Sequence, residues 1–137
     1  MNTVIDQAVQ VRLIATTFGP HAVPAVLHYQ PADPLAVRMF FPPEISLDGS
    51  AVDWAFAREL LDEGLRVPAG RGDVRVRPSG PDRTVMEFHA EEGVAMVQLR
   101  TADVRQFLAR SYEAVPAGGE SAHLGMDHGL AELFGAA

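Results

Sequence analysis

Apolar and polar residues alternate one by one through much of this chain, and this pattern restricts the fold more than any other feature. Apolar residues occupy every second position from Val9 to Leu13 and again from Val23 to Tyr29. A strand turns successive side chains to opposite faces, so a period of two predicts strands that bury one face. The chain is therefore expected to build sheets with one buried side.

Turn residues such as Asp33-Pro34 and Gly80-Pro81 separate these runs. Two of the alternating runs are followed directly by sequence that favours a helix. A short helix is predicted over Arg58–Glu63, with Gly64 closing it in the left-handed conformation. A longer helix is predicted from Thr101 to Val115, and a last short one over 127–134. Strands are predicted at 9–13, 23–29, 37–41, 51–57, 74–77, 85–89 and 94–99.

The length of 137 residues suits a single domain spanning 1–137, and a hydrophobic content of 47% can supply its core. A run of strands followed by a helix occurs twice. This order predicts an α+β fold made of two antiparallel sheets.

Composition excludes several classes of protein. The chain has no cysteine, and all 11 of its basic residues are arginine. Disulfides, thiolate metal sites, Schiff-base lysines and the phosphate-binding lysine of a P-loop are therefore excluded. The first ten residues lack the features of a signal peptide, and no apolar run is long enough to span a membrane. A cytoplasmic protein without membrane insertion is expected.

No catalytic, cofactor-binding or metal-binding residue is predicted. None of the five histidines pairs with another at the spacing of a helical zinc site, and no serine lies in a Gly-x-Ser-x-Gly elbow. Acidic pairs such as Glu59 with Asp62 or Glu63 are expected on a solvated helix face. The chain is therefore interpreted as a non-enzyme.

Positive charge gathers in one segment of an acidic protein. The net charge is −7, yet residues 64–84 hold five arginines and only two aspartates. Arg75 and Arg77 lie two apart on a predicted strand and so share one face, with Arg71 just before them. A solvated polar face, contact with an acidic partner and nucleic-acid binding are the three alternatives, in decreasing order. The acidic pI of 5.1 and the 7% aromatic content make nucleic acid the least favoured.

Trp54 and Phe56 share one face of the predicted strand at 51–57. A lone tryptophan can anchor a protein interface. Packing between a sheet and the helix that carries Leu60 and Leu61 is the more common role, so we expect these aromatics in the core.

One continuous motif runs from Val52 to Leu65 and reads VDWAFARELLDEGL. It is followed by GDVRV at 72–76 and by Pro-Ser at 78–79, and the stretches 29–37 and 107–118 add to it. In this order the chain resembles the SsgA-like proteins, a group that controls sporulation-specific cell division in actinomycetes, and it is most similar to the SsgB-like members. The resemblance covers nearly the whole chain.

This resemblance implies a non-enzymatic regulator that acts at the cell division septum. SsgB-like members are thought to recruit the tubulin-like division protein FtsZ, with other SsgA-like proteins helping to position them. The implied fold has two antiparallel four-stranded sheets with short helices, like the whirly-type folds that bind single-stranded DNA. The implied assembly is a homo-oligomer, expected to be a trimer. No cofactor is implied, and a nucleic-acid-binding regulator is kept as the alternative because fold likeness is weak support for function.

Two groups of residues follow as candidates. The first group consists of the arginines expected to contact a partner: Arg71, Arg75 and Arg77. The second group consists of the residues expected to form the structural core of the motif: Trp54, Phe56, Leu60, Leu61 and Gly64.

Overall fold

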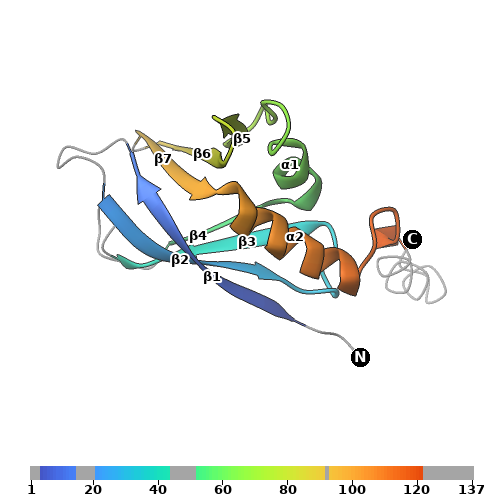
Figure 1. Cartoon of the computed structure of the whole chain (residues 1–137). Helices are drawn as coiled ribbons and strands as arrows, with labels where there is room; N and C mark the ends of the chain where they lie inside the picture. Colours follow the sequence, from blue (N-terminus) through green and yellow to red (C-terminus); the bar gives the residue numbers. More distant parts are fainter. Residues whose placement is uncertain (1–3, 15–20, 44–51, 92, 122–137) are drawn as a thin grey trace.

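The computed structural model of the chain describes residues 4–14, 21–43, 52–91 and 93–121, and the helix predicted at 127–134 lies outside them. Where the alternation predicts strands, the structure has strands, and both remaining predicted helices are present (Figure 1). In chain order the elements are β1 (Ile5–Leu13), β2 (His21–Tyr29), β3 (Ala36–Phe41), β4 (Val52–Ala57), α1 (Arg58–Glu63), β5 (Val74–Ser79), β6 (Arg83–Ala90), β7 (Gly93–Arg100) and α2 (Thr101–Ala114).

The described strands form one antiparallel sheet in the order β4-β3-β2-β1-β7-β6-β5. The α+β class is confirmed, but the expected pair of four-stranded sheets is wrong. β1 joins the two halves, because it pairs along its whole length with β2 and, at Arg12 and Leu13, with Gln98 and Val97 of β7. Alternation shows which face of a strand is buried but not which strands lie beside it. The likeness to whirly-type folds stays a prediction.

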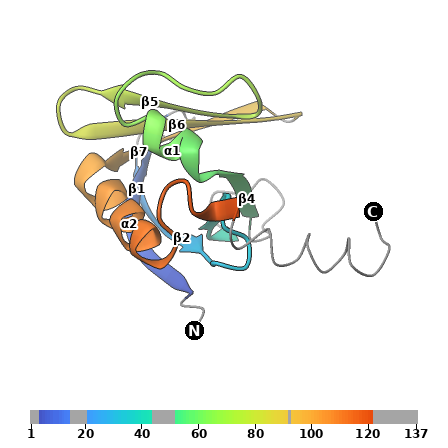
Figure 2. The same ribbon diagram turned by 90° about the vertical axis from the view of Figure 1, so that its right-hand side faces the viewer.

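The sheet curls, so that strands from its two ends contact each other. Phe88 of β6 packs against Phe41 of β3 and against Trp54 and Phe56 of β4, with ring centroids 5.3 to 6.5 Å apart. Figure 2 shows β5 and β6 on one side of α1 and β2 and β4 on the other. The inner face of the curled sheet therefore holds the core, and its outer face points away from the core.

Both helices pack on that inner face. The apolar stripe predicted for α2 is buried at Val104, Phe107 and Leu108, and the helix lies against β1 and β7. α1 buries Leu61 between β4 and β5. Each such side chain contributes roughly 1.5–3 kcal/mol when it is fully buried. None of the described helices is long and apolar enough to cross a membrane.

Gly64 closes α1 by a different mechanism from the one predicted. Its φ of −66° is right-handed, so the expected left-handed conformation is wrong. A Cβ atom at this position would lie only 2.4 Å from side-chain atoms of Val76 on β5. Glycine is therefore required because β5 approaches the end of α1 closely, not because of backbone conformation.

Candidate protein-interaction surface

Arg75 and Arg77 point to the outer face of the sheet, as their spacing predicts. They alternate along β5 with Val74 and Val76, which are buried on the inner face. Arg75 is exposed and its Nε atom donates a long hydrogen bond, 3.4 Å, to the carbonyl oxygen of Gly72. Arg77 is ion-paired with Glu87 on the neighbouring strand β6.

Glu87 is the acidic centre of this part of the outer face. It accepts hydrogen bonds from Arg77 and from Nε2 of His89, the second at 3.0 Å. Partial burial acts to raise the pKa of Glu87, but the hydrogen bonds from His89 and Arg77 outweigh that effect and hold the pKa below its ordinary value. Glu87 is therefore charged near neutral pH and ion-paired with Arg77. It also lies directly opposite Arg75 in the register of β5 and β6, but forms no ion pair with Arg75.

Arg71 is separated from the other two predicted arginines. It is exposed in the segment before β5 and lines a hollow of about 350 Å³ between β4 and β5. The same hollow is lined by Trp54, Leu60 and Asp73. The structure thus brings Arg75 and Arg77 together but places Arg71 beside the aromatic segment of β4.

Three of the predicted core residues of the motif, Trp54, Phe56 and Leu60, line this hollow. Phe56 and Leu61 are buried, at 7% and 0% exposure. Trp54 and Leu60 are half-buried and pack against the core from its edge. Trp54 thus has one side on Phe88 and one side toward the hollow.

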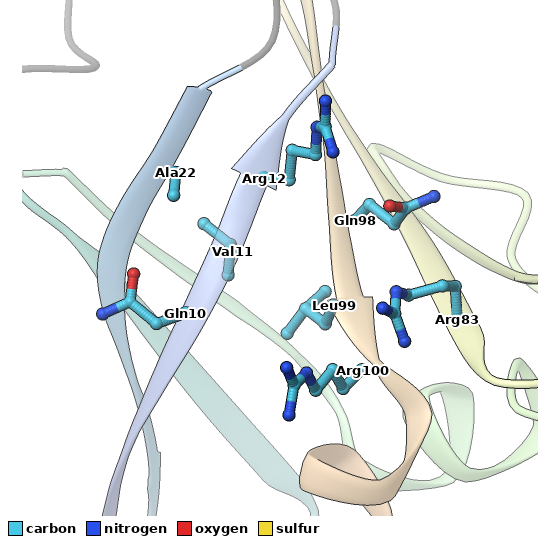
Figure 3. Close-up of a pocket in the computed structure, with 8 residues that line it drawn as sticks. All are labelled: Gln10, Val11, Arg12, Ala22, Arg83, Gln98, Leu99 and Arg100. Carbon is cyan, nitrogen blue, oxygen red and sulfur yellow. The ribbon is translucent and has the colours of Figure 1, made fainter.

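Sequence reasoning missed a second group of arginines on the outer face. Arg83 of β6 lies directly opposite Arg100 of β7, and Gln98 of β7 lies directly opposite Arg12 of β1. Together with Gln10 they line a hollow of about 380 Å³ at the junction of β1 and β7 (Figure 3). We call this the arginine hollow.

Two of these guanidinium groups have no partner among the described residues. Arg12 and Arg100 make neither a hydrogen bond nor an ion pair there, whereas Arg83 contacts only the neighbouring Asp82, with 3.3 Å between its Nη1 atom and a carboxylate oxygen. The three arginines come from three strands and are far apart in sequence. No local pattern could reveal them, because only the cross-strand register brings them together.

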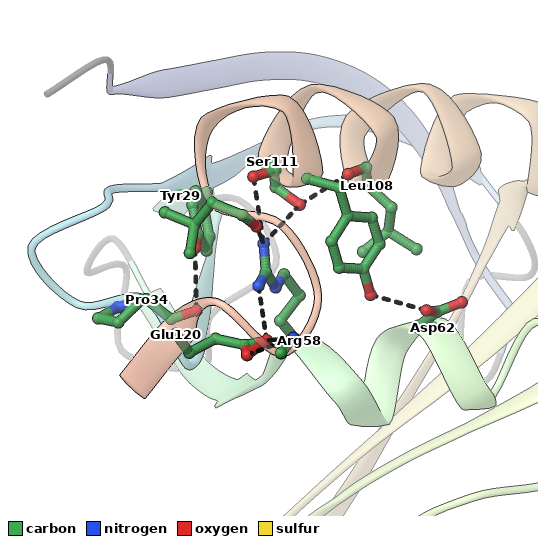
Figure 4. Close-up of polar contacts among 10 residues, drawn as sticks. Tyr29, Pro34, Arg58, Asp62, Leu108, Ser111 and Glu120 are labelled. Carbon is green, nitrogen blue, oxygen red and sulfur yellow. Dashed lines mark hydrogen bonds and ion pairs between the residues drawn. The ribbon is translucent and has the colours of Figure 1, made fainter. Parts of the chain in front are cut away.

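A buried arginine, Arg58, was also missed. It is 2% exposed and lies at the start of α1 (Figure 4). Its Nη1 atom donates to the carbonyl oxygens of Val115 and Ser111, at 2.7 and 3.1 Å, and its Nη2 atom donates to Glu120 at 2.8 Å. The sequence did carry a signal, since Arg58 lies three residues before Leu61 and so shares its buried helix face.

Two tyrosine rings enclose the Arg58 guanidinium, whose central carbon lies 4.9 Å from the ring centroid of Tyr29 and 4.3 Å from that of Tyr112. Burial raises the pKa of both tyrosines, and for Tyr112 the hydrogen bond to Asp62 raises it further. Hydrogen bonds from its own backbone N–H and from Arg58 lower the pKa of Glu120. This cluster ties α1 to the end of α2 and to the segment after it.

No group of three or more metal-ligating side chains occurs within the described ranges. The histidines whose surroundings are described pair with carboxylates: His28 with Asp6 at 2.6 Å, and His89 with Glu87. Charged side chains of the described residues are spread over the outer face of the sheet.

Comparison with known proteins identifies the family of the chain. Residues 23–120 match the family model described as Streptomyces sporulation and cell division protein, SsgA. The chain belongs to the SsgA family. The match contains the motif of β4 and α1, both predicted arginine positions of β5, and the strands that form the arginine hollow except for β1.

Relatives within the SsgA family extend over nearly the whole chain. The chain is 41% identical to the sporulation-specific cell division protein SsgB of Kineococcus radiotolerans, over 96% of this chain and 80% of that protein. It is 37% identical to SsgB of Streptomyces coelicolor, over 98% of each chain. The recognition made from sequence motifs is confirmed.

Solved structures of SsgA-family proteins share the fold. An SsgA-like sporulation-specific cell division protein from Thermobifida fusca superposes with a TM-score of 0.82 at 36% identity, covering 96% of both chains. An SsgB structure, described with mutations that correlate with longitudinal cell division during sporulation of Streptomyces coelicolor, gives 0.78 at 36% identity, covering 90% of this chain and 97% of that one. The family is one of sporulation-specific cell division proteins and not of enzymes.

Proposed function

We propose that this chain is an adaptor that places the sporulation septum by recruiting the tubulin-like protein FtsZ, and that it acts at the septum. The observation that carries the proposal is the near full-length similarity to proteins named for sporulation-specific cell division. An adaptor needs a surface for its partner rather than a reaction site. The outer face of the sheet offers such a surface, with charged side chains on a rigid frame.

Arg75, Arg77 and Arg71 form the first part of the contact surface that we propose. Arg75 is the strongest candidate, because its only described hydrogen bond is long. Arg77 can contribute only if its guanidinium is shared between Glu87 and the partner, since those two residues are ion-paired. Arg71 would contact the partner beside Trp54, at the hollow formed by the segment before β5. Arginine favours this role because its planar guanidinium binds carboxylates through two parallel hydrogen bonds.

Pelleting with polymerised FtsZ tests the recruitment. The purified chain should sediment with FtsZ polymers formed with GTP and stay in the supernatant without them. The double variant Arg75→Gln/Arg77→Gln should sediment several-fold less, whereas Arg105→Gln, which removes an exposed arginine of α2, should sediment like the wild type. Absence of co-sedimentation by the wild-type chain would overturn the recruitment proposal.

We also propose that the chain assembles with copies of itself, as a trimer, and with other SsgA-like proteins. β4 and β5 end the sheet on its two sides. β5 is bridged at Val76 by Ala69, whereas the exposed residues Asp53, Ala55 and Ala57 alternate along the edge strand β4. Sheet edges of this kind are usually paired or covered, because their backbone groups can template another strand.

Light scattering tests this assembly. A homo-oligomer should give a mass that is a multiple of 14.8 kDa, and a trimer should give three times that mass. A mass equal to that of one chain at micromolar concentration contradicts the proposal.

A further inference from the structure

We propose that the arginine hollow, formed by Arg12, Arg83, Arg100, Gln10 and Gln98, binds an acidic peptide segment of a partner protein. The inference rests on the proposed adaptor function in one respect, namely that the ligand belongs to a protein partner. The site itself is different from the one already proposed on β5. It lies across β6, β7 and β1, and the arguments for it are charge, shape and the chemistry of its lining (Figure 3).

The charge argument begins with the register of β6 and β7. Arg83 and Arg100 are directly opposite each other, and like charges in that position repel. Arg83 has an exposed neighbour, Asp82, but Arg100 and Arg12 have no acidic partner in the described part of the chain. This arrangement occurs in a protein with a net charge of −7, where carboxylates outnumber guanidinium groups. A bound anion would relieve the repulsion and complete the pairing.

Shape is the second argument. The ladder between β1 and β7 has only two residue pairs, so the two strands diverge beyond Arg12 and Gln98. The hollow opens where they diverge, and the buried residues Val11 and Leu99 also line it. Its volume of about 380 Å³ falls in the lower part of the range of ligand sites, roughly 300–1,000 Å³. That volume accommodates a few side chains of a peptide.

The lining favours a peptide. Each guanidinium can hold a carboxylate through two hydrogen bonds, and each carboxamide can both donate and accept. Gln10 and Gln98 therefore suit the N–H and C=O groups of a peptide backbone that runs past the arginines. Arg77 lies in the same cross-strand row as Gln98 and Arg12, with Val85 between Arg77 and Gln98. An extended acidic segment could thus continue from the hollow toward β5.

Single-stranded nucleic acid fits the hollow less well. Proteins that bind single strands stack bases on aromatic rings beside a basic groove. No aromatic residue lines the arginine hollow, and the whole chain is acidic, with a pI of about 5.1. The carboxylate of a peptide is therefore the better match to a site built from arginine and glutamine alone among its polar groups.

Fluorescence anisotropy with short labelled probes tests the proposal on the full chain. A poly-glutamate peptide should bind, a poly-glutamine peptide of equal length should not, and binding should weaken steeply as salt is added. Tighter binding of a labelled oligothymidylate than of poly-glutamate would overturn the proposal in favour of nucleic acid. Failure of poly-glutamate to bind at low salt would also overturn it.

Variants locate the site. Arg12→Gln and Arg100→Gln should each weaken poly-glutamate binding about tenfold, which is the loss of one charge-assisted pairing of roughly 1.5 kcal/mol. Arg105→Gln on α2 removes the same charge from another exposed position and should leave the affinity within about twofold. Circular dichroism melts should show all three variants folded. Equal weakening by Arg12→Gln and Arg105→Gln would mean that net charge alone attracts the peptide, and would overturn the site.

FtsZ pelleting separates this inference from the proposed function. If poly-glutamate binds in the hollow but FtsZ polymers do not retain the chain, the hollow stands and the recruitment proposal fails. If FtsZ polymers retain the chain and the Arg12→Gln/Arg100→Gln variant equally well, while poly-glutamate does not bind, the hollow is wrong and recruitment stands.

Discussion

The structure holds arginine in two contrasting settings. Arg58 is buried, hydrogen-bonded to two carbonyl oxygens and to Glu120, and enclosed by two tyrosine rings. Arg12 and Arg100 lie exposed on the outer face of the sheet without an acidic partner within the described residues. The same functional group is thus paired with protein acceptors inside the molecule and, among the described residues, has no protein partner at these two positions of the outer face.

This difference separates stability from binding. A buried charge is tolerated only when every donor is paired, so the partners of Arg58 are needed by the fold. Exposed like charges are tolerated because water screens them, but they add nothing to the fold. Substitutions near Arg58 should therefore change the melting temperature. Substitutions on the outer face should change binding and leave the melting temperature almost unchanged.

The largest expected effect is that of Arg58→Met. Methionine keeps much of the volume but removes the Arg58 donor from the carbonyl oxygen of Val115, and one of the donors from the carbonyl oxygen of Ser111 and from the carboxylate of Glu120. Loss of one member of a buried ion pair typically costs about 3–5 kcal/mol, which should lower Tm by on the order of 10–20 °C. Thermal unfolding followed by circular dichroism measures it.

Arg58→Lys sharpens that result. Lysine keeps the charge but has no planar fork to reach the carbonyl oxygens and Glu120 together, so it should recover only part of the lost Tm. Full recovery of Tm by lysine would show that the positive charge alone stabilises this site. The planar shape of the guanidinium would then not be needed.

The second largest expected effect is that of Trp54→Ala. Trp54 packs on Phe88 but is only half-buried, so the loss should fall below that of a fully buried aromatic, at about 2–3 kcal/mol. Tm should fall clearly and FtsZ pelleting should fall only in proportion to unfolding. If the variant instead melts within a few degrees of wild type but no longer sediments with FtsZ, Trp54 anchors the partner. Its role is then binding, like that proposed for the outer face, and not stability.

The strands and α2 could be predicted from the sequence because burial of one face leaves a periodic trace. The runs ending at Leu13 and Tyr29 alternate, and α2 has its apolar stripe at Val104, Phe107 and Leu108. The single sheet could not be predicted, since it depends on two residue pairs between β1 and β7 that no local pattern encodes. Register is a property of the folded chain.

The residues of the candidate sites also divide into those that a local sequence pattern reveals and those that depend on long-range contacts. Arg75 and Arg77 were found because both lie on one strand, where spacing of two gives a shared face. Arg12, Arg83 and Arg100 were not found, because they share a face only after three strands are aligned. The role of Gly64 was also misjudged, since the close approach of Val76 is a long-range contact.

A smaller effect is expected for Gly64→Ala, which probes the close contact between α1 and β5. The added Cβ atom would lie 2.4 Å from Val76 side-chain atoms, and such overpacking costs about 1–3 kcal/mol. Gly72→Ala is the matched control, since a Cβ atom there meets nothing within 4 Å. It should leave Tm unchanged or slightly raised. Equal Tm values for the two variants would show that β5 can move away from α1 at little cost.

The smallest expected effect is that of Arg100→Gln, and its sign is opposite to that of Arg58→Met. The substitution removes one member of the like-charged pair with Arg83, so it should raise stability by about 0.5 kcal/mol or less. That corresponds to roughly 1–2 °C in Tm at low salt, and the gain should vanish in about 1 M salt, where the Debye length is about 3 Å.

Arg38→Gln is the control for that measurement, because Arg38 is exposed on the same face but ion-paired with Asp53 at 3.0 Å. It should lower Tm slightly at low salt, in the direction opposite to Arg100→Gln, and the loss should also fade as salt is added. A Tm for Arg100→Gln that falls below that of wild type would mean that Arg100 is needed by the fold. The contrast between the buried, paired Arg58 and the exposed, unpaired Arg12 and Arg100 would then be wrong for Arg100, the residue on which the arginine hollow most depends.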